Sequence, residues 1–401
     1  MDRLETLSQT GMDTESAMDT AMDSPVQVSC ERDDLAAAAA MVQRAVSSRT
    51  TLPILSGVLI ETTPEGLRLV GTDLELSVET FLAVSATGHA AVVLPARYFG
   101  EIVRHLPERE VRIEFDAGRR IATISSGKAV YSINSMEAAE FPLFPQVEGN
   151  VWWKVQGKDL AEFVRQTAFA AATDENRPFL TGVLMVFGGN EARLAATDTF
   201  RLALRKVTLD GGTDVSTAVG SGQMIVPARA LSEVARIIQN ESGEVEVSAS
   251  QNQVAFKCRK TTIVSRLIDG QFPNYDRVIP KMWKTRMVVE RLRLLEAVER
   301  VAVLGKDEFG TVKLGYGGDT LTISANAPDV GMAFEEVAVR TVEGETGETA
   351  LRARYLLDAL RVVADEELIV EVTGAVSPIV LRQARAEGTD YLYLIMPVTV
   401  N

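Results

Sequence analysis

Two aspartates at matching places in the sequence are the first candidates for chemistry. Asp73 and Asp198 each follow a threonine at the end of an apolar run. Paired carboxylates can work as general acid and base, provided that they face one another. These two lie in separate copies of a repeated stretch, and different residues follow each Thr-Asp pair. Side-chain hydrogen bonds to the backbone of a turn explain the repetition better, so we predict no acid–base pair.

The remaining reactive residue types are sparse. The two histidines are His89 and His105, and the two cysteines are Cys30 and Cys258. Two cysteines cannot form a disulfide framework, which fits a reducing cytoplasm. The histidines and cysteines together offer no clustered ligands for zinc or haem. The sequence also lacks a phosphate-binding glycine loop and a nucleophile elbow. We therefore predict a cytoplasmic protein that is not an enzyme and that needs no cofactor or metal.

Length and composition are those of a globular protein with several domains. The 401 residues are 46% apolar and 24% charged, which suits two to four well-filled domains. No apolar run reaches the roughly 18 residues of a membrane span. Residues 1–24 lack the apolar segment of a signal peptide, and we interpret them as a disordered acidic extension. A start site placed too far upstream is the alternative.

The stretch from Asn176 to Arg205 is the element that the rest of the chain repeats. It predicts a buried strand from Leu180 to Phe187, a glycine turn and a further pair of strands. Residues 49–79 carry the same pattern, and residues 309–335 carry a weaker third copy. Around each copy the predicted order is strand, amphipathic helix, strands, second helix and strands. The second helices open at Pro95, Pro227 and Arg352.

This internal repeat predicts an α+β fold class with three similar domains, each with two helices packed on antiparallel sheets. The expected boundaries of the domains are 25–148, 149–278 and 279–401.

The predicted helices carry a charge opposite to that of the whole chain. A net charge of −14 argues against a basic surface that simply coats DNA. The six helical segments nevertheless hold 16 Lys and Arg against 11 Asp and Glu. The segments are 33–49, 95–109, 157–172, 227–240, 290–306 and 351–364. One explanation is that arginine is a good helix former and suits the solvent-exposed side of any helix. The more specific hypothesis is that all six helices face one polyanion, while the acidic exterior of the protein repels it elsewhere.

Three groups of motifs follow one another in a fixed order. They are LPIL with GTDLE in the first copy, LTGV with ATD and RLA in the second, and FPNYDRVIP before the third. Together they resemble the bacterial sliding clamp family, the beta subunit of DNA polymerase III, over residues 26–400. The resemblance implies the DNA clamp fold, with two head-to-tail subunits closing a six-domain ring whose helices line the hole.

The resemblance also implies the function and the partners. The expected function is that of a DNA polymerase processivity factor, a homodimer that holds double-stranded DNA by topology and without sequence preference. The expected partners are a clamp loader, the replicative DNA polymerase and other proteins with short clamp-binding peptides, and no membrane. The alternatives are a duplicate or drug-resistant clamp paralogue and a peptide-binding scaffold that does not act on DNA.

A pocket for partner peptides is implied between the second and third domains, as an apolar cleft with two cations on its rim. Its residues here would be Leu180, Thr197, Arg201, Leu202, Pro273, Arg277, Val278, Met396, Pro397 and Val398. Plain core packing is the alternative for the leucines and Val278. Thr199 and Phe200 stand where many relatives have a small residue and then His or Tyr, and the tail 398–401 lacks a basic residue. Peptide preference therefore stays open.

Two further surfaces are implied by the resemblance. The subunit contact would join Lys128 and Tyr131, on an exposed strand edge, to Val303 and Leu304. A strand edge covered within the monomer is the alternative. The residues expected to face DNA are Arg49, Arg97, Arg177, Phe179, Arg229 and Arg354.

Overall fold

The structure is a computed structural model that describes residues 25–47, 50–116, 118–147, 151–188, 191–208, 222–239, 243–305, 310–384 and 389–398. It contains two compact units. The first comprises Met1–Gln146 with Arg259–Val264, and the second comprises Val147–Cys258 with Ser265–Asn401. The predicted extension 1–24, Arg49 and the tail residues 399–401 lie outside the described residues.

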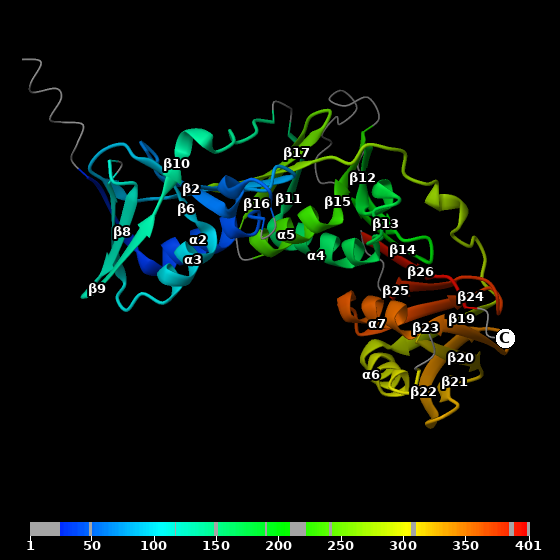
Figure 1. Cartoon of the computed structure of the whole chain (residues 1–401). Coiled ribbons are helices and arrows are strands. Elements are labelled where there is room, and N and C mark those ends of the chain that lie inside the picture. The colour runs from blue at the N-terminus through cyan, green and yellow to red at the C-terminus, as the bar shows by residue number, and fades with distance from the viewer. Residues whose placement is uncertain are drawn as a thin grey trace, which may run out of the picture. The chain divides into compact units, whose positions relative to one another are not determined.

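The first unit contains helices α2 (Arg32–Gln43) and α3 (Ala96–Arg104), which pack side by side (Figure 1). One sheet has the strand order β5-β1-β7-β8-β9, and the strands β10-β6-β2-β3-β4 are also hydrogen-bonded in that order. The strands are β1 (Val26–Glu31), β2 (Gly57–Thr63), β3 (Gly66–Thr72), β4 (Leu76–Leu82), β5 (Ser85–Ala86), β6 (Ala91–Pro95), β7 (Glu110–Asp116), β8 (Ile121–Ser126), β9 (Ala129–Asn134) and β10 (Met136–Glu137). Most of β18 (Thr261–Arg266) also belongs to this unit, where the hydroxyls of Thr80 and Thr261 lie 2.9 Å apart.

The second unit contains the helix pairs α4 (Gly157–Thr167) with α5 (Ala228–Ile238) and α6 (Arg291–Ala302) with α7 (Ala353–Val362). Its large sheet has the order β15-β12-β13-β14-β26-β25-β24-β19-β22-β21-β20-β23, and β17-β16-β11 pair beside it. The strands before residue 260 are β11 (Val151–Gln156), β12 (Gly182–Gly188), β13 (Glu191–Thr197), β14 (Arg201–Thr208), β15 (Gln223–Pro227), β16 (Glu244–Ala249) and β17 (Gln253–Cys258). The later strands are β19 (Thr285–Glu290), β20 (Thr311–Gly317), β21 (Thr320–Ala327), β22 (Gly331–Glu343), β23 (Gly347–Arg352), β24 (Glu367–Val372), β25 (Ile379–Gln383) and β26 (Thr389–Ile395).

The predicted threefold repeat and α+β class are confirmed. The second and third repeats run strand, helix, four strands, a second helix and three strands, and the first repeat keeps this order with two additional two-residue strands, β5 and β10. Every described strand pairing is antiparallel. The amphipathic pattern explains the helices: α5 buries Leu231, Val234 and Ile238 on one face and exposes Arg229 and Arg236 on the other. The second and third repeats share one compact unit, and the boundaries expected at 148/149 and 278/279 stay predictions.

Local details differ from the sequence-based expectations at element ends. The helix α2 begins at Arg32, so Asp33 and Asp34 lie in its first turn, where their charge favours the helix dipole. The strand expected from Leu180 begins instead at Gly182, because Pro178 favours a short 3₁₀ turn, η5 (Pro178–Leu180). The other 3₁₀ turns are η2 (Pro53–Ser56), η3 (Ala138–Glu140), η4 (Ala168–Ala170) and η7 (Tyr275–Arg277).

Candidate functional site

The turn between β13 and β14 is held by its own side chains. Asp198 Oδ1 accepts hydrogen bonds from the backbone N–H groups of Phe200 (2.9 Å) and Arg201 (3.0 Å). The Thr197 hydroxyl donates to the Arg201 carbonyl at 2.6 Å and accepts from the Thr199 N–H at 3.1 Å. Thr199 has a φ of 79°, a left-handed conformation that β-branched residues rarely adopt. This tight turn fixes the place of Phe200 at the surface.

The first repeat builds the same turn. Asp73 Oδ1 accepts from the N–H groups of Glu75 (3.0 Å) and Leu76 (2.8 Å), and Leu74 has a φ of 75°. The prediction that the Thr-Asp pairs serve local side-chain-to-backbone bonding is thus confirmed. The two repeats differ at the next position, where the buried Leu76 of the first is replaced by Arg201 in the second.

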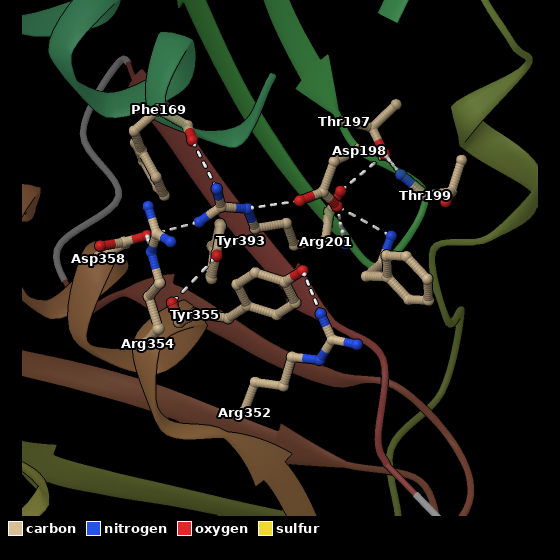
Figure 2. Close-up of polar contacts among 11 residues, drawn as sticks. Phe169, Thr197, Asp198, Thr199, Arg201, Arg352, Arg354, Tyr355, Asp358 and Tyr393 are labelled. Atoms are coloured by element: carbon tan, nitrogen blue, oxygen red, sulfur yellow. Dashed lines mark hydrogen bonds and ion pairs between the residues drawn. The ribbon is translucent and has the colours of Figure 1, made fainter. Parts of the chain in front are cut away.

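Arg201 uses all its nitrogen atoms inside the protein (Figure 2). Its Nε donates to Asp198 Oδ2 at 3.0 Å, Nη1 to Asp358 Oδ2 at 2.7 Å and Nη2 to the Phe169 carbonyl at 2.8 Å. The rings of Phe169 and Tyr355 lie 5.5 and 4.6 Å from its Cζ atom. With 7% of its surface exposed, Arg201 joins the second repeat to α7 of the third.

Charge and burial oppose each other at this guanidinium. Burial by itself would lower the pKa of Arg201, but the Tyr393 hydroxyl and the carboxylates of Asp358 and Asp198 raise that pKa above its ordinary value. Burial likewise raises the pKa of Tyr393, whose hydroxyl donates to the Tyr355 carbonyl at 3.0 Å. Arg201 is therefore a fixed cation, and Tyr393 is a neutral donor.

The neighbouring arginine of β14 has a different environment. The strands β14 and β26 pair from Arg201↔Ile395 to Val207↔Thr389, which makes the sheet continuous between the repeats (Figure 1). Arg205 donates from Nη1 to Gln383 Oε1 at 2.6 Å and lies 5.2 Å from the Phe163 ring centroid. Burial lowers the pKa of Arg205. These contacts place a polar side-chain pair, Arg205 and Gln383, where the second and third repeats meet.

Phe200 in the β13–β14 turn is an exposed aromatic residue. Phe200 is 48% exposed, and Arg352 Cζ lies 5.0 Å from the centroid of its ring. The Met396 N–H donates to the Phe200 carbonyl at 2.8 Å, and the Val398 N–H donates to the Ala350 carbonyl at 2.8 Å. Met396 is thereby tied to the turn, and Val398 is tied to β23.

The residues expected in the peptide pocket lie on segments that meet here. Leu202 packs in a cluster with Tyr275 of η7, and Phe272 packs against the same cluster. Pro273, Arg277, Val278 and Met396 are exposed, and Pro397 and Val398 are half-buried. Thr197, Leu180 and Leu202 are buried, so the two leucines serve core packing in this structure.

The expectation of two cations on the rim was wrong for one of them. Arg277 is exposed, but Arg201 is buried, since its strand position points toward Asp358 and the Phe169 carbonyl. Sequence reasoning missed Arg352, Tyr355 and Asp358. Their available signal was the repeated Ala-Arg opening of the second helices, which places Tyr355 and Asp358 on the first turns of α7.

The residues expected to face DNA are mostly exposed. Arg97, Arg177, Arg229 and Arg354 are exposed, whereas Phe179 is half-buried against the cluster around Leu202. Arg49 lies outside the described residues. Ten arginines on the α-helices or directly after them are exposed in the described part of the chain: Arg44, Arg97, Arg104, Arg165, Arg229, Arg236, Arg293, Arg300, Arg354 and Arg361.

The residues expected at the subunit contact are also accessible. Lys128 and Tyr131 are exposed, and β9 is the edge strand of its sheet. Val303 is 63% exposed, and Leu304 is half-buried. The sequence did not single out β22, which pairs with β19 only from Val339 onward and exposes Met332 and Phe334 on its earlier half.

Metal binding and membrane insertion have no support in the described part of the chain. Among the described residues, no group of three or more His, Cys, Asp or Glu could hold a metal ion. None of the helices that the structure describes has the length and apolar character needed to cross a membrane.

Comparisons with known proteins match nearly the whole chain. Family models described as the N-terminal, central and C-terminal domains of the DNA polymerase III beta subunit match residues 26–145, 154–274 and 276–399. The beta sliding clamp of Bacillus subtilis (strain 168) is 34% identical over 378 residues, which cover 92% of this chain and 98% of that protein. The beta sliding clamp of Staphylococcus aureus (strain N315) is 31% identical over 365 residues, 88% of this chain and 94% of the relative.

Solved structures show the same likeness. The crystal structure of the DNA polymerase sliding clamp from Bacillus subtilis has a TM-score of 0.87 at 33% identity and covers 94% of this chain and 100% of that chain. The beta subunit of DNA polymerase III from Thermotoga maritima has a TM-score of 0.85 at 28% identity, with the same coverage of 94% and 100%.

Proposed function

The chain belongs to the DNA polymerase III beta-subunit family and is a DNA polymerase processivity factor, and we propose that it performs this function as a ring of two head-to-tail subunits closed around duplex DNA. The role needs no catalytic group, because a closed ring keeps its hold on DNA by topology. The ring acts in the cytoplasm, with the replicative polymerase and the clamp loader as its partners.

The observation that carries the proposal is the distribution of arginine. In a chain of net charge −14, each of the described helices from α2 to α7 carries or ends at an exposed arginine. Several are balanced by an acid on a helix, such as Arg236 with Glu233 at 2.7 Å and Arg361 with Glu299 at 2.8 Å. Partly neutralised cations attract phosphates without reading sequence and without tight local binding. Such a surface suits a ring that must slide.

The subunit contact is proposed between two strand edges. The edge strand β9 offers Val130 (63% exposed) and Tyr131 (38% exposed). The earlier half of β22 pairs with β21 on one side only, because its pairing with β19 on the other side starts at Val339, and it offers Met332 (76%) and Phe334 (58%). Exposed apolar edge strands favour pairing with another chain. Since the two surfaces belong to different repeats, the contact is heterologous, and two copies related by a closing rotation form a ring.

The polymerase and other partners are proposed to bind at the exposed side of the β13–β14 turn. Phe200, Met396 and Val278 offer apolar surface there, and Arg277 and Arg352 supply cations. A short peptide with apolar anchors and an acidic or polar remainder suits this chemistry. Binding by short peptides lets several partners use one place in turn.

The decisive experiment compares two forms of one plasmid. Protein loaded onto nicked circular duplex stays bound through gel filtration, and it is lost when a restriction enzyme linearises the same DNA. Equal retention on both forms excludes topological binding and favours a scaffold that does not encircle DNA. Light scattering supports the same scheme if the particle has about twice the chain mass of 43.5 kDa.

A further inference from the structure

A groove lies between α2 and α3 in the first unit. It has a volume of about 670 Å³, and its lining includes Arg44, Arg97, Tyr98 and Gln43 but no Asp or Glu. Gln43 is held in this lining, because its amide donates to the Ala96 carbonyl and packs so closely on Gly100 that a Cβ there would lie 2.7 Å from Gln43 Oε1. An acid-free groove is unexpected in a chain with 55 Asp and Glu, and it favours an anion.

The three repeats use the equivalent helix positions differently. The second helices align as Ala96-Arg97-Tyr98, Ala228-Arg229-Ala230 and Ala353-Arg354-Tyr355. In the third repeat the Tyr355 ring stacks on Arg201 at 4.6 Å, and Arg354 Nε lies 3.9 Å from Asp358.

In the first repeat, the equivalent residues Arg97 and Tyr98 do not take part in such contacts. Tyr98 is 64% exposed, and among the described residues Arg97 has no hydrogen-bond or ion-pair partner. The second repeat has the buried Ala230 in place of an aromatic ring. Only the first of the three described positions therefore presents a free aromatic ring beside a free guanidinium.

We propose that this groove binds a nucleotide of single-stranded DNA, with the base stacked on Tyr98 and the phosphate held by Arg97 and Arg44. An aromatic face next to cations is the usual arrangement for binding single strands without sequence preference. The backbone N–H groups at the start of α3, whose N-cap is Pro95, favour the same phosphate. The proposal rests on the proposed function, which puts DNA on the helix faces.

Fluorescence anisotropy with a labelled twelve-nucleotide oligothymidylate tests the proposal at low salt. Tyr98→Ala weakens binding about fivefold or more, the lower range for one base stacked on an aromatic ring, and Tyr98→Phe retains it. Arg97→Ala weakens binding and lowers the slope of log K against log salt by about 0.7, as expected for one phosphate contact on a single strand. Arg119→Ala, at an exposed arginine on the turn between β7 and β8 and outside the helices, is the matched control and binds like the unmodified protein.

A second readout identifies the contact directly. Oligonucleotides that carry 5-iodouracil cross-link to stacked aromatic rings on irradiation, and mass spectrometry of the digest should find the bond at Tyr98. Unchanged affinity of Tyr98→Ala, or cross-links only at other residues, overturns the proposal. If the variant keeps oligonucleotide binding and instead loses binding of polymerase, the groove belongs to a protein partner and the proposal is wrong.

Failure of this inference and failure of the proposed function give different results. Loss of the nicked-circle retention in the unmodified protein contradicts the ring, whatever the oligonucleotide does. Normal retention with unchanged oligonucleotide binding by Tyr98→Ala contradicts only the groove.

Discussion

The Arg201 guanidinium and the Asp358 carboxylate are joined by a hydrogen bond of 2.7 Å although they are 157 positions apart in the chain. Asp358 aligns with Glu101 and Glu233 of the other second helices, and each of those pairs with an arginine three residues later on its own helix. In the third repeat the acid is directed to another domain. The same helix position therefore holds a surface ion pair in the first two repeats and a contact between repeats in the third. We call the contact between Arg201 and Asp358 the joint.

Removing one partner of this pair should destabilise the joint. Arg201→Ala leaves the Asp358 and Asp198 carboxylates without their buried cation, and breaking a buried pair costs about 3–5 kcal/mol. Asp358→Asn keeps a hydrogen-bond acceptor and should cost less, about 1–3 kcal/mol. The midpoint of urea unfolding, followed by circular dichroism, measures both.

The control for this pair is Arg354→Ala. Its Nε lies 3.9 Å from Asp358 and its side chain is 84% exposed, so the change should stay within about 0.5 kcal/mol. If Arg201→Ala is as mild as this control, the guanidinium contributes nothing to the joint.

The repeat, the helices and the turn were predictable because each leaves a local pattern. The spacing of apolar residues predicts which face of a helix is buried, as in α5. The Thr-Asp pair predicts the turn after β13, because the residues that bond to one another there are neighbours in the chain. Exposure of Arg97 and Arg229 follows from the same periodicity.

The burial of Arg201 could not be predicted, because its partners come from distant segments. Phe169 precedes it by 32 positions and Asp358 follows it by 157. The register Arg201↔Ile395 across β14 and β26 is also nonlocal. An arginine in a strand is ordinarily read as a surface residue, and only tertiary packing reverses that expectation.

Phe200 should contribute to peptide binding without contributing to stability. Phe200 is 48% exposed, so Phe200→Ala loses contact area for a ligand but little core packing. We expect at least a tenfold loss of affinity, about 1.4 kcal/mol, for a labelled peptide with apolar anchors. Arg352→Ala should cause a smaller loss of about two- to fivefold, since it supports the ring by a cation–π contact at 5.0 Å.

The matched control for Phe200 is Val376→Ala, an 82% exposed apolar residue on the β24–β25 turn. Calorimetric titration should give the same affinity for this variant as for the unmodified protein. Equal affinity of Phe200→Ala would mean that the peptide binds elsewhere.

Charge placed on either strand edge should separate the subunits. Tyr131→Arg on β9 and Phe334→Arg on β22 both put a cation into the proposed contact, where desolvation disfavours it. Light scattering at micromolar concentration should then give the chain mass of 43.5 kDa instead of twice that value. Val376→Arg should leave the mass of the particle unchanged. A dimer that survives both edge variants would place the contact on another surface.

Cys30 should be much less reactive than its partial exposure suggests. Burial, with smaller effects from the Asp34 and Glu31 carboxylates, raises the pKa of its thiol from 9.0 to about 12. Only the thiolate reacts, so the reactive fraction at pH 8 falls by about a thousandfold, and greater intrinsic nucleophilicity restores a factor of roughly twenty. Alkylation by iodoacetamide should therefore be about fiftyfold slower than for an ordinary cysteine.

The sign of the pH dependence distinguishes this from simple steric protection. The rate should rise about tenfold per pH unit through pH 8–11, because the thiolate fraction grows until pH passes the raised pKa. Asp34→Asn removes one cause of the shift and should speed the reaction at every pH in this range. A Cys258→Ala background confines the signal to one thiol, since Cys258 is 2% exposed and should react only after unfolding. A rate that levels off near pH 9 would contradict the raised pKa.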